Sequence, residues 1–298
     1  MYRYLMLAGA AFATIASALP AEARDLWSPQ QAKSWYGKQP WMVGANYTNR
    51  GAINQFEMWQ ADTFNPQQID QELGWAEDMG MNVMRVYLHN MLWENDAAGL
   101  KQRMEQFLQI ADKHKIRIVF VLFDSCWDPN PVAGPQRPPI PGVHNSGWMQ
   151  APGAARLADA SQYDKLEGYV KDVVGTFAND KRVVAWDVWN EPNNEGGGGG
   201  SYKPTPNKVA LVAGLLGRVF DWARSVDPTQ PLTSGVWIGE HWDKAETLDA
   251  VERIQLSQSD INSFHDYNWP EQWETRAKQV LSYGRPVFCT EYMARGNG

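Results

Sequence analysis

Two glutamates stand where a barrel enzyme would carry catalytic carboxylates. Glu191 follows the apolar run at residues 183–189, and Pro192 then prevents the strand from continuing. Glu291 closes a second apolar run, at residues 285–290. Retaining glycoside hydrolysis needs one carboxylate to attack the anomeric carbon and a second carboxyl group, about 5–5.5 Å away, to protonate the leaving oxygen. The pair therefore predicts this chemistry, provided that the fold brings the two side chains together.

The elements that would position them are short strands alternating with amphipathic helices. Such alternation predicts a parallel sheet. The turn after the first strand, Tyr47 to Gly51, lacks the glycine-rich phosphate motif typical of an open doubly wound sheet, so a closed barrel is favoured. The seven predicted strands are residues 41–46, 82–89, 117–123, 183–189, 232–238, 261–267 and 285–291.

The spacing of the two glutamates supports the barrel. They are 100 residues apart, and a (β/α)₈ domain averages about 31 residues per strand–helix unit. Three units therefore separate them, which assigns Glu191 to the fourth strand and Glu291 to the seventh, on one rim. The helices between the strands have recognisable ends: Asn65 is a predicted N-cap before Pro66, and Gly80 ends that helix. Its predicted buried face is Ile69, Leu73, Ala76 and Met79.

The two ends of the sequence carry separate predictions. Arg3, an apolar stretch at residues 5–19 and a small-residue site ending at Ala23 predict a signal peptide over residues 1–23 and a secreted or periplasmic protein. Residues 24–298 are interpreted as a single catalytic domain. Because only seven strands are found before Gly298, the sequence predicts a (β/α)₈ TIM barrel truncated after the seventh strand, with the eighth unit missing.

Composition excludes several classes of partner. A net charge of −7 and a pI near 5.3 argue against nucleic acid and anionic membranes, both of which attract basic surfaces. The first predicted strand has no His-x-His pair, and neither a phosphate loop nor a Gly-x-Ser-x-Gly motif occurs, so no metal and no cofactor are expected. Cys126 and Cys289 are predicted to lie nearly opposite each other and to remain free thiols. A monomer is expected.

The motifs Asn190-Glu191-Pro192 and the strand-ending Glu291 resemble the cellulase family, glycoside hydrolase family 5, in its clan of retaining β-glycosidases. Residues 52–60 (AINQFEMWQ) and 73–77 (LGWAE) are similar to secreted bacterial proteins labelled 1,4-β-xylanase or cellulase family. The resemblance covers nearly all of residues 24–298. It implies that Glu191 is the acid/base and Glu291 the nucleophile.

Four other positions match the pattern of this clan. The resemblance implies that Arg85 keeps the nucleophile ionised and that Asn190 binds the sugar 2-hydroxyl. It also implies that His265 lies near the acid/base and that the Tyr267 hydroxyl contacts the nucleophile. Two departures are visible: residues 123–127 read FDSCW where many members carry a histidine, and the tryptophan of an eighth strand is absent.

Substrate contacts are predicted less sharply than the carboxylates. For Asp124, a substrate contact and a strand-end cap are equally good interpretations. Several of the 15 tryptophans follow predicted strands, where a ring can stack on a sugar face, and Trp237 is the first choice. The rim tryptophans are Trp93, Trp127, Trp148, Trp237, Trp242 and Trp269. The predicted function is retaining hydrolysis of a β-linked glycan (xylan, mannan or glucan), and the alternative is a catalytically silent carbohydrate-binding protein on the same scaffold.

Overall fold

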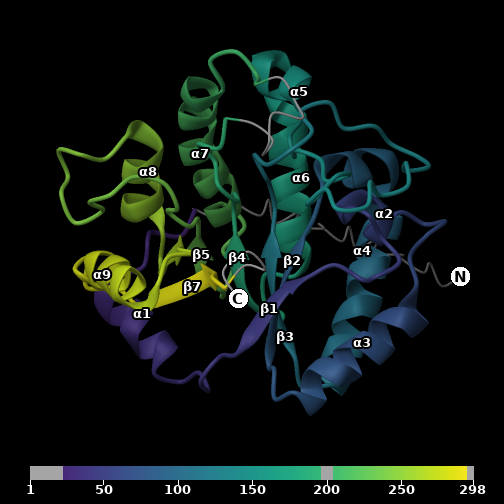
Figure 1. Cartoon of the computed structure of the whole chain (residues 1–298), viewed down its shortest axis with the longest axis horizontal. Coiled ribbons are helices and arrows are strands. Elements are labelled where there is room, and N and C mark those ends of the chain that lie inside the picture. Colours follow the sequence, from purple (N-terminus) through teal and green to yellow (C-terminus); the bar gives the residue numbers. More distant parts are fainter. Residues whose placement is uncertain (1–22, 196–203, 294–298) are drawn as a thin grey trace, which may run out of the picture.

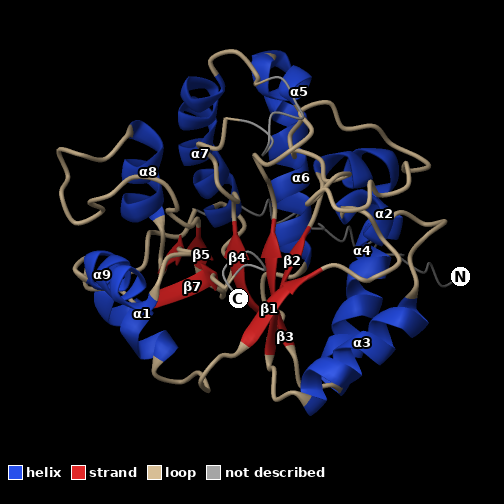
Figure 2. Cartoon of the chain, viewed as in Figure 1, coloured by secondary structure: helices blue, strands red, loops and turns tan. Residues whose placement is uncertain are grey.

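A computed structural model describes residues 23–195 and 204–293 of the chain. The predicted signal peptide lies, except for Ala23, outside the described residues. Within them, helices surround a set of parallel strands (Figures 1 and 2). The strands are β1 (Gly44–Tyr47), β2 (Val83–Tyr87), β3 (Arg117–Val121), β4 (Val183–Asp187), β5 (Leu232–Thr233), β6 (Asn262–His265) and β7 (Val287–Glu291).

The strands follow one another in chain order, which confirms the predicted parallel topology. β1 to β5 form one sheet, and β6 pairs with β7. A parallel bridge between Val236 and Phe264 joins the two groups, with Val236 N–H donating to Ser263 O at 3.1 Å and His265 N–H to Val236 O at 2.9 Å. The architecture is therefore a (β/α)₈-type barrel, with seven strands in the described part of the chain.

The helices lie around the outside of the strands, except that α1 lies across one end of them (Figure 1). They are α1 (Pro29–Tyr36), α2 (Gln55–Trp59), α3 (Pro66–Asp78), α4 (Asn90–Lys113), α5 (Ala154–Ala158), α6 (Tyr163–Thr176), α7 (Lys208–Arg224), α8 (Ala250–Gln258) and α9 (Pro270–Leu281), with a 3₁₀ turn η1 (Ala160–Gln162). The main core lies between them and the outward residues of β2 to β4, such as Ile118, Phe120 and Trp186. No helix in the described part of the chain is long and apolar enough to cross a membrane.

Helix α3 shows how local chemistry sets the element boundaries. The Asn65 side chain accepts a hydrogen bond from Gln68 N–H, Pro66 occupies the first turn, and Gly80 takes the left-handed φ of 82° just beyond the end. Ile69, Leu73 and Ala76 are buried as predicted. Met79 is 68% exposed and does not belong to the buried face, because the helix ends at Asp78 and Met79 is its C-cap.

Helix α1 closes the barrel at the end opposite the strand termini that carry the two glutamates. Its Ala32 is fully buried in a small apolar cluster with Val119 of β3, Ala185 of β4 and Ile261 at the start of β6. Phe288 of β7 packs against the same cluster and lies 6.2 Å, between ring centroids, from Trp35. Residues from both strand groups, β1–β5 and β6–β7, share this cluster, so the strands curve around it.

Strand β5 is shorter than predicted. The sequence predicts residues 232–238, whereas ladder pairing with β4 covers only Leu232 and Thr233. Beyond them, side chains bind the backbone instead: Ser259 Oγ accepts from Ser234 N–H at 3.3 Å, and Gln255 donates to the Gly235 carbonyl. Pairing resumes at Val236, which bridges to β6.

Candidate active site

The two predicted carboxylates come from the ends of two strands, β4 and β7, that are separated by β5 and β6. Glu291 is the last residue of β7. Glu191 follows β4 and has a positive φ of 42°, which is unfavourable for a side chain with a Cβ and is held here by the packing around it. Glu191 is 7% exposed, and the Glu291 side chain is 12% exposed. Both therefore lie in a site that is shielded from bulk water.

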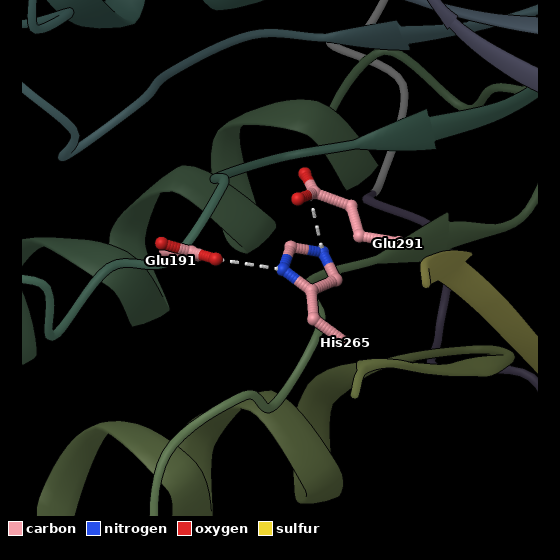
Figure 3. Close-up of side chains that lie close together, drawn as sticks. All are labelled: Glu191, His265 and Glu291. Atoms are coloured by element: carbon pink, nitrogen blue, oxygen red, sulfur yellow. Dashed lines mark hydrogen bonds and ion pairs between the residues drawn. The ribbon is translucent and has the colours of Figure 1, made fainter. Parts of the chain in front are cut away.

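His265, the last residue of β6, lies between the two carboxylates (Figure 3). Its Nδ1 is 2.9 Å from Glu191 Oε1, and its Nε2 is 3.7 Å from Glu291 Oε1. One oxygen of each carboxylate and a ring nitrogen of His265 all lie within 4.8 Å of one another. The two carboxyl groups therefore face each other at the short range that a direct attack on the anomeric carbon requires.

Glu291 is surrounded by groups that favour its ionised form. Arg85 Nη1 donates to its Oε1 at 2.8 Å, the Tyr87 hydroxyl donates to the same oxygen at 2.9 Å, and the Tyr267 hydroxyl donates to Oε2. Burial alone would raise the pKa of Glu291, but the charges of His265 and Arg85 and the two tyrosine hydrogen bonds lower this pKa well below its usual range. The nucleophile of the predicted mechanism is thus held as a carboxylate.

The same charges act on the histidine. Burial opposes a charge on His265, but Glu291 and the hydrogen bond to Glu191 raise the pKa of the imidazole above its usual value. A positive charge between two carboxylates reduces their mutual repulsion. His265 therefore lets two acidic groups lie a few ångströms apart in a buried site.

Arg85 is held in place by a residue that the sequence reasoning missed. Its Nη2 lies 2.6 Å from Asp187 Oδ2, and the Asp187 side chain is fully buried. Arg85 also donates to Asn190 Oδ1 at 2.8 Å. A charged residue inside the apolar β4 segment VVAWD was a usable signal, because a buried carboxylate requires a partner.

Asp124 is enclosed by protein rather than directed at solvent. It is 1% exposed, accepts from Asn190 Nδ2 at 2.9 Å and from Trp148 Nε1 at 2.6 Å, and burial raises its pKa to about 6. Of the two readings of Asp124, its position favours the support of other site residues over direct contact with a sugar. Asn190, 4% exposed, is fixed between Asp124 and Arg85.

A second group of partners binds the other oxygen of Glu191. Cys126 Sγ lies 3.1 Å from Glu191 Oε2, and Asn194 Nδ2 donates to the same oxygen at 2.9 Å. Neither contact was predicted, because neither residue belongs to a recognised motif. Cys126 and Cys289 are both free thiols, as predicted.

The rim tryptophans separate into different environments. Trp237 is half-buried, and its Nε1 donates to Asn193 Oδ1 at 2.7 Å. Trp148 is half-buried beside the site, where it packs edge-to-face on Tyr87 with ring centroids 5.1 Å apart. Trp242 is 1% exposed and packs on Phe264, so it belongs to the core, not the rim. Trp242 was predicted at the rim because it follows the predicted strand at residues 232–238, but its side chain is directed into the core.

The cluster of Glu191, His265 and Glu291 also has the residue types of a metal site. Its geometry does not converge on one point, because the two nitrogens of His265 face different carboxylates on opposite sides of the ring (Figure 3). The Arg85 guanidinium also lies 2.8 Å from Glu291. This guanidinium already supplies a positive charge to the Glu291 carboxylate.

Comparisons with known proteins find several similar chains. The chain is 21% identical to mannan endo-1,4-beta-mannosidase A of Hypocrea jecorina, over 85% of this chain and 63% of that protein. It is 24% identical to the probable mannan endo-1,4-beta-mannosidase A-2 of Aspergillus terreus, over 97% of this chain and 80% of that protein. Two probable mannosidases F of Aspergillus species match over 56% of their length. The chain thus spans about 56% to 63% of three of these relatives.

Solved structures show the same fold at low sequence identity. The endo-1,4-beta-mannanase of Rhizomucor miehei superposes with a TM-score of 0.55 at 16% identity, over 85% of this chain and 81% of that one. The endo-beta-1,4-mannanase of Thermotoga petrophila superposes with a TM-score of 0.57 at 16% identity, over 87% of this chain and 62% of that one. These relatives carry mannanase names, so the resemblance to proteins labelled xylanase is not confirmed.

A family-level match covers most of the chain. Residues 43–297 match the family described as Cellulase (glycosyl hydrolase family 5). That range contains Glu191, His265 and Glu291 together with Arg85. The chain therefore belongs to glycosyl hydrolase family 5.

Proposed function

We propose that the protein is a retaining glycoside hydrolase that cleaves β-1,4-linked mannan. The observation that carries the proposal is the pair of largely buried carboxylates on either side of His265, with one oxygen of each within 4.8 Å of the other. Arg85, Tyr87 and Tyr267 keep Glu291 ionised, as a nucleophile requires. Glu191 lacks a contact with Arg85 in the described residues and is free to take the other role.

The reaction proceeds in two balanced steps. Glu291 attacks the anomeric carbon and forms a glycosyl ester, while Glu191 gives its proton to the departing glycosidic oxygen. Glu191, now a carboxylate, then removes a proton from water. That water attacks the anomeric carbon, breaks the ester and releases Glu291. Two inversions give net retention, and Glu191 ends the cycle protonated.

The substrate is inferred from the relatives. Every relative compared above is named a mannosidase or mannanase. Xylan and glucan were left open by the sequence: glucan differs from mannan in the configuration at C2, and xylan differs there too and also lacks the C6 hydroxymethyl group. A panel of β-1,4-mannan, xylan and glucan therefore tests the substrate directly, and faster cleavage of xylan or glucan than of mannan would reject it.

The mechanism is tested by following the anomeric proton of a released sugar by NMR, with an activated aryl β-mannoside as substrate. Initial release of the β-anomer is expected, and initial release of the α-anomer would contradict retention. Glu291→Gln should lower kcat by at least about 10³-fold, because the nucleophile is lost. Glu274→Gln, on the exposed face of α9, is the matched control and should leave kcat unchanged.

Sugar binding without turnover would favour the alternative function, a catalytically silent carbohydrate-binding protein. Calorimetric binding of manno-oligosaccharides with no product from any glycan in the panel would mean that the scaffold binds sugar but does not cleave it. Glu291→Gln retaining wild-type activity would mean that another group is the nucleophile.

We further propose that the protein is exported and cut after Ala23. The basic Arg3, the apolar stretch and the small-residue site support this. N-terminal sequencing of protein recovered from outside the cytoplasm should begin at Arg24. A mature protein that begins at Met1 would reject the proposal.

A further inference from the structure

We propose that Cys126 and Asn194 form a clamp that positions Glu191 for proton transfer. The inference rests on the proposed function, because it assigns to these residues a role in how Glu191 acts. Both side chains bind the same carboxylate oxygen, Oε2, at 3.1 Å and 2.9 Å. His265 contacts the other oxygen, Oε1. The three contacts together fix the plane of the Glu191 carboxyl group.

The clamp is assembled from two loops that the barrel brings together. Cys126 follows β3 and Asn194 follows β4, and Asn194 Nδ2 also lies 3.4 Å from Cys126 Sγ. The Cys126 backbone N–H donates to Asp124 Oδ1 at 2.9 Å, which anchors the first loop. Because β3 and β4 are neighbouring strands, their following loops meet directly at the rim.

A buried lysine holds the loop of Cys126 in place through a hydrogen bond to its backbone. Lys208 of α7 is 3% exposed, and its Nζ donates to the carbonyl of Ser125, the residue before Cys126. Ser125 Oγ in turn donates to the Pro192 carbonyl at 2.9 Å. The loop of Cys126 and the loop of Asn194 are therefore tied together on both sides of Glu191.

The thiol can act only as a donor to Glu191. Cys126 is 7% exposed, and burial, together with the negative charges of Asp124 and Glu191, raises the pKa of the thiol well above its usual value. The sulfur therefore keeps its proton, and the S–H group is directed at a carboxylate oxygen. A thiol is a weak donor, so its main effect is to restrict the carboxyl group, while the Asn194 amide supplies the stronger hydrogen bond.

This arrangement matters in both steps of the proposed reaction. After Glu191 has protonated the leaving oxygen, the clamp stabilises the carboxylate that remains. In the second step the same carboxylate must be aimed at a water molecule. Loosening the clamp should therefore impair general acid and general base catalysis, which together contribute about 10²–10⁴-fold, and should leave the attack by Glu291 intact.

The test compares two aryl β-mannosides that differ in their need for acid assistance. Dinitrophenolate leaves without protonation, whereas phenolate does not. Cys126→Ala and Asn194→Ala should each lower kcat/KM for the phenyl substrate about tenfold, which is part of the general-acid contribution. For the 2,4-dinitrophenyl substrate, each variant should lower kcat/KM less than about threefold. Azide, which needs no general base, should accelerate turnover of the dinitrophenyl substrate by both variants.

Controls separate positioning from a general loss of structure. Cys126→Ser retains a donor and should recover part of the lost activity on the phenyl substrate. Cys289→Ala removes the other thiol, which accepts from Trp273 Nε1 at 3.3 Å on the side of α9, and should leave the ratio between the two substrates unchanged. If Cys126→Ala fails to fold, Asn194→Ala, at a half-buried position, still provides the test.

Each outcome decides one of the two proposals. An equal loss on both aryl substrates, or no loss on either, would overturn the clamp while leaving the hydrolase proposal in place. A wild-type protein that cleaves neither aryl substrate and no polysaccharide would overturn the proposed function, and the clamp would fall with it.

Discussion

At the scale of single residues, the site gives two identical side chains different surroundings. Glu291 contacts a guanidinium and two tyrosine hydroxyls. Glu191 contacts an imidazole, a thiol and an amide. Only the first set contains a permanent positive charge. The proposed nucleophile and the proposed acid/base thus differ by their neighbours and not by their own chemistry.

The hydrogen bond from Tyr267 to Glu291 gives a pH-dependent prediction. Since this bond helps to lower the pKa of Glu291, Tyr267→Phe should raise that pKa. The nucleophile is then protonated at higher pH, so the acidic limb of kcat/KM should move upward by about one pH unit. Tyr283→Phe, whose hydroxyl donates to Trp242 O far from the carboxylates, is the matched control. An unchanged acidic limb for Tyr267→Phe would contradict the assigned role.

Trp237 gives a prediction about binding. A half-buried indole at the rim can stack on a sugar face, so Trp237→Ala should raise KM for mannan about tenfold with little change in kcat, as expected for binding that is uniform through the reaction. Trp41→Ala is the control, because Trp41 is 80% exposed and precedes β1, at the opposite end of the strands. Equal effects of the two substitutions would remove Trp237 from the substrate site.

At the scale of elements, the side chains of the site lie on strands or on the segments that directly follow them. β6 ends at His265 and β7 at Glu291, and these two residues are register partners across the parallel pair. The opposite end of the barrel is filled by α1, whose N-terminus has a complete capping box between Ser28 and Gln31. The C-terminal ends of the strands therefore carry the candidate site, while α1 closes the N-terminal ends by apolar packing.

The seal by α1 is testable through Ala32. Ala32 is fully buried among the side chains of this cluster. Ala32→Leu therefore overpacks the cluster and should lower the free energy of unfolding by about 1–3 kcal/mol. Ser34→Leu introduces the same side chain at an exposed position of α1 and should change stability by less than about 0.5 kcal/mol. Urea unfolding measures both. Equal effects would mean that α1 does not pack in the barrel end.

At the scale of the whole molecule, the segment before α1 is tied to the other half of the barrel. Arg24 Nη2 lies 2.6 Å from Asp260 Oδ2, and the Asp260 side chain is fully buried. The same carboxylate accepts from Trp27 N–H at 2.9 Å and from Leu232 N–H at 2.8 Å. One side chain thus joins the start of the described chain to β5 and to the residues before β6.

Removing that charge should destabilise the entire fold. Asp260→Asn leaves the Arg24 guanidinium, whose side chain is 10% exposed, without its ion pair, and a broken buried pair costs about 3–5 kcal/mol. The expected result is a lower Tm and a lower urea midpoint, with the affinity for substrate retained in the folded fraction. Asp243→Asn, at an exposed position, is the control. A Tm equal to that of the wild type would show that the segment contributes little.

The sequence by itself determined the features that are encoded locally. Strand and helix alternation, the Asn65 cap with its Gly80 stop, and the placement of Glu191 and Glu291 at strand ends follow from short-range patterns. The spacing of the two glutamates equals about three strand–helix units of average length, and this was enough to predict that both lie on one rim. The residues predicted around them, Arg85, His265 and Tyr267, each contact one of the two glutamates.

Tertiary structure alone decided which partners those residues have. Asp187, 102 positions from Arg85 in the chain, and Cys126, 65 positions from Glu191, become neighbours only when the sheet curves. Trp242 was predicted at the rim and is buried against Phe264. Contacts of this kind depend on side-chain direction and on packing between distant segments, and neither is encoded in a local pattern of residue types.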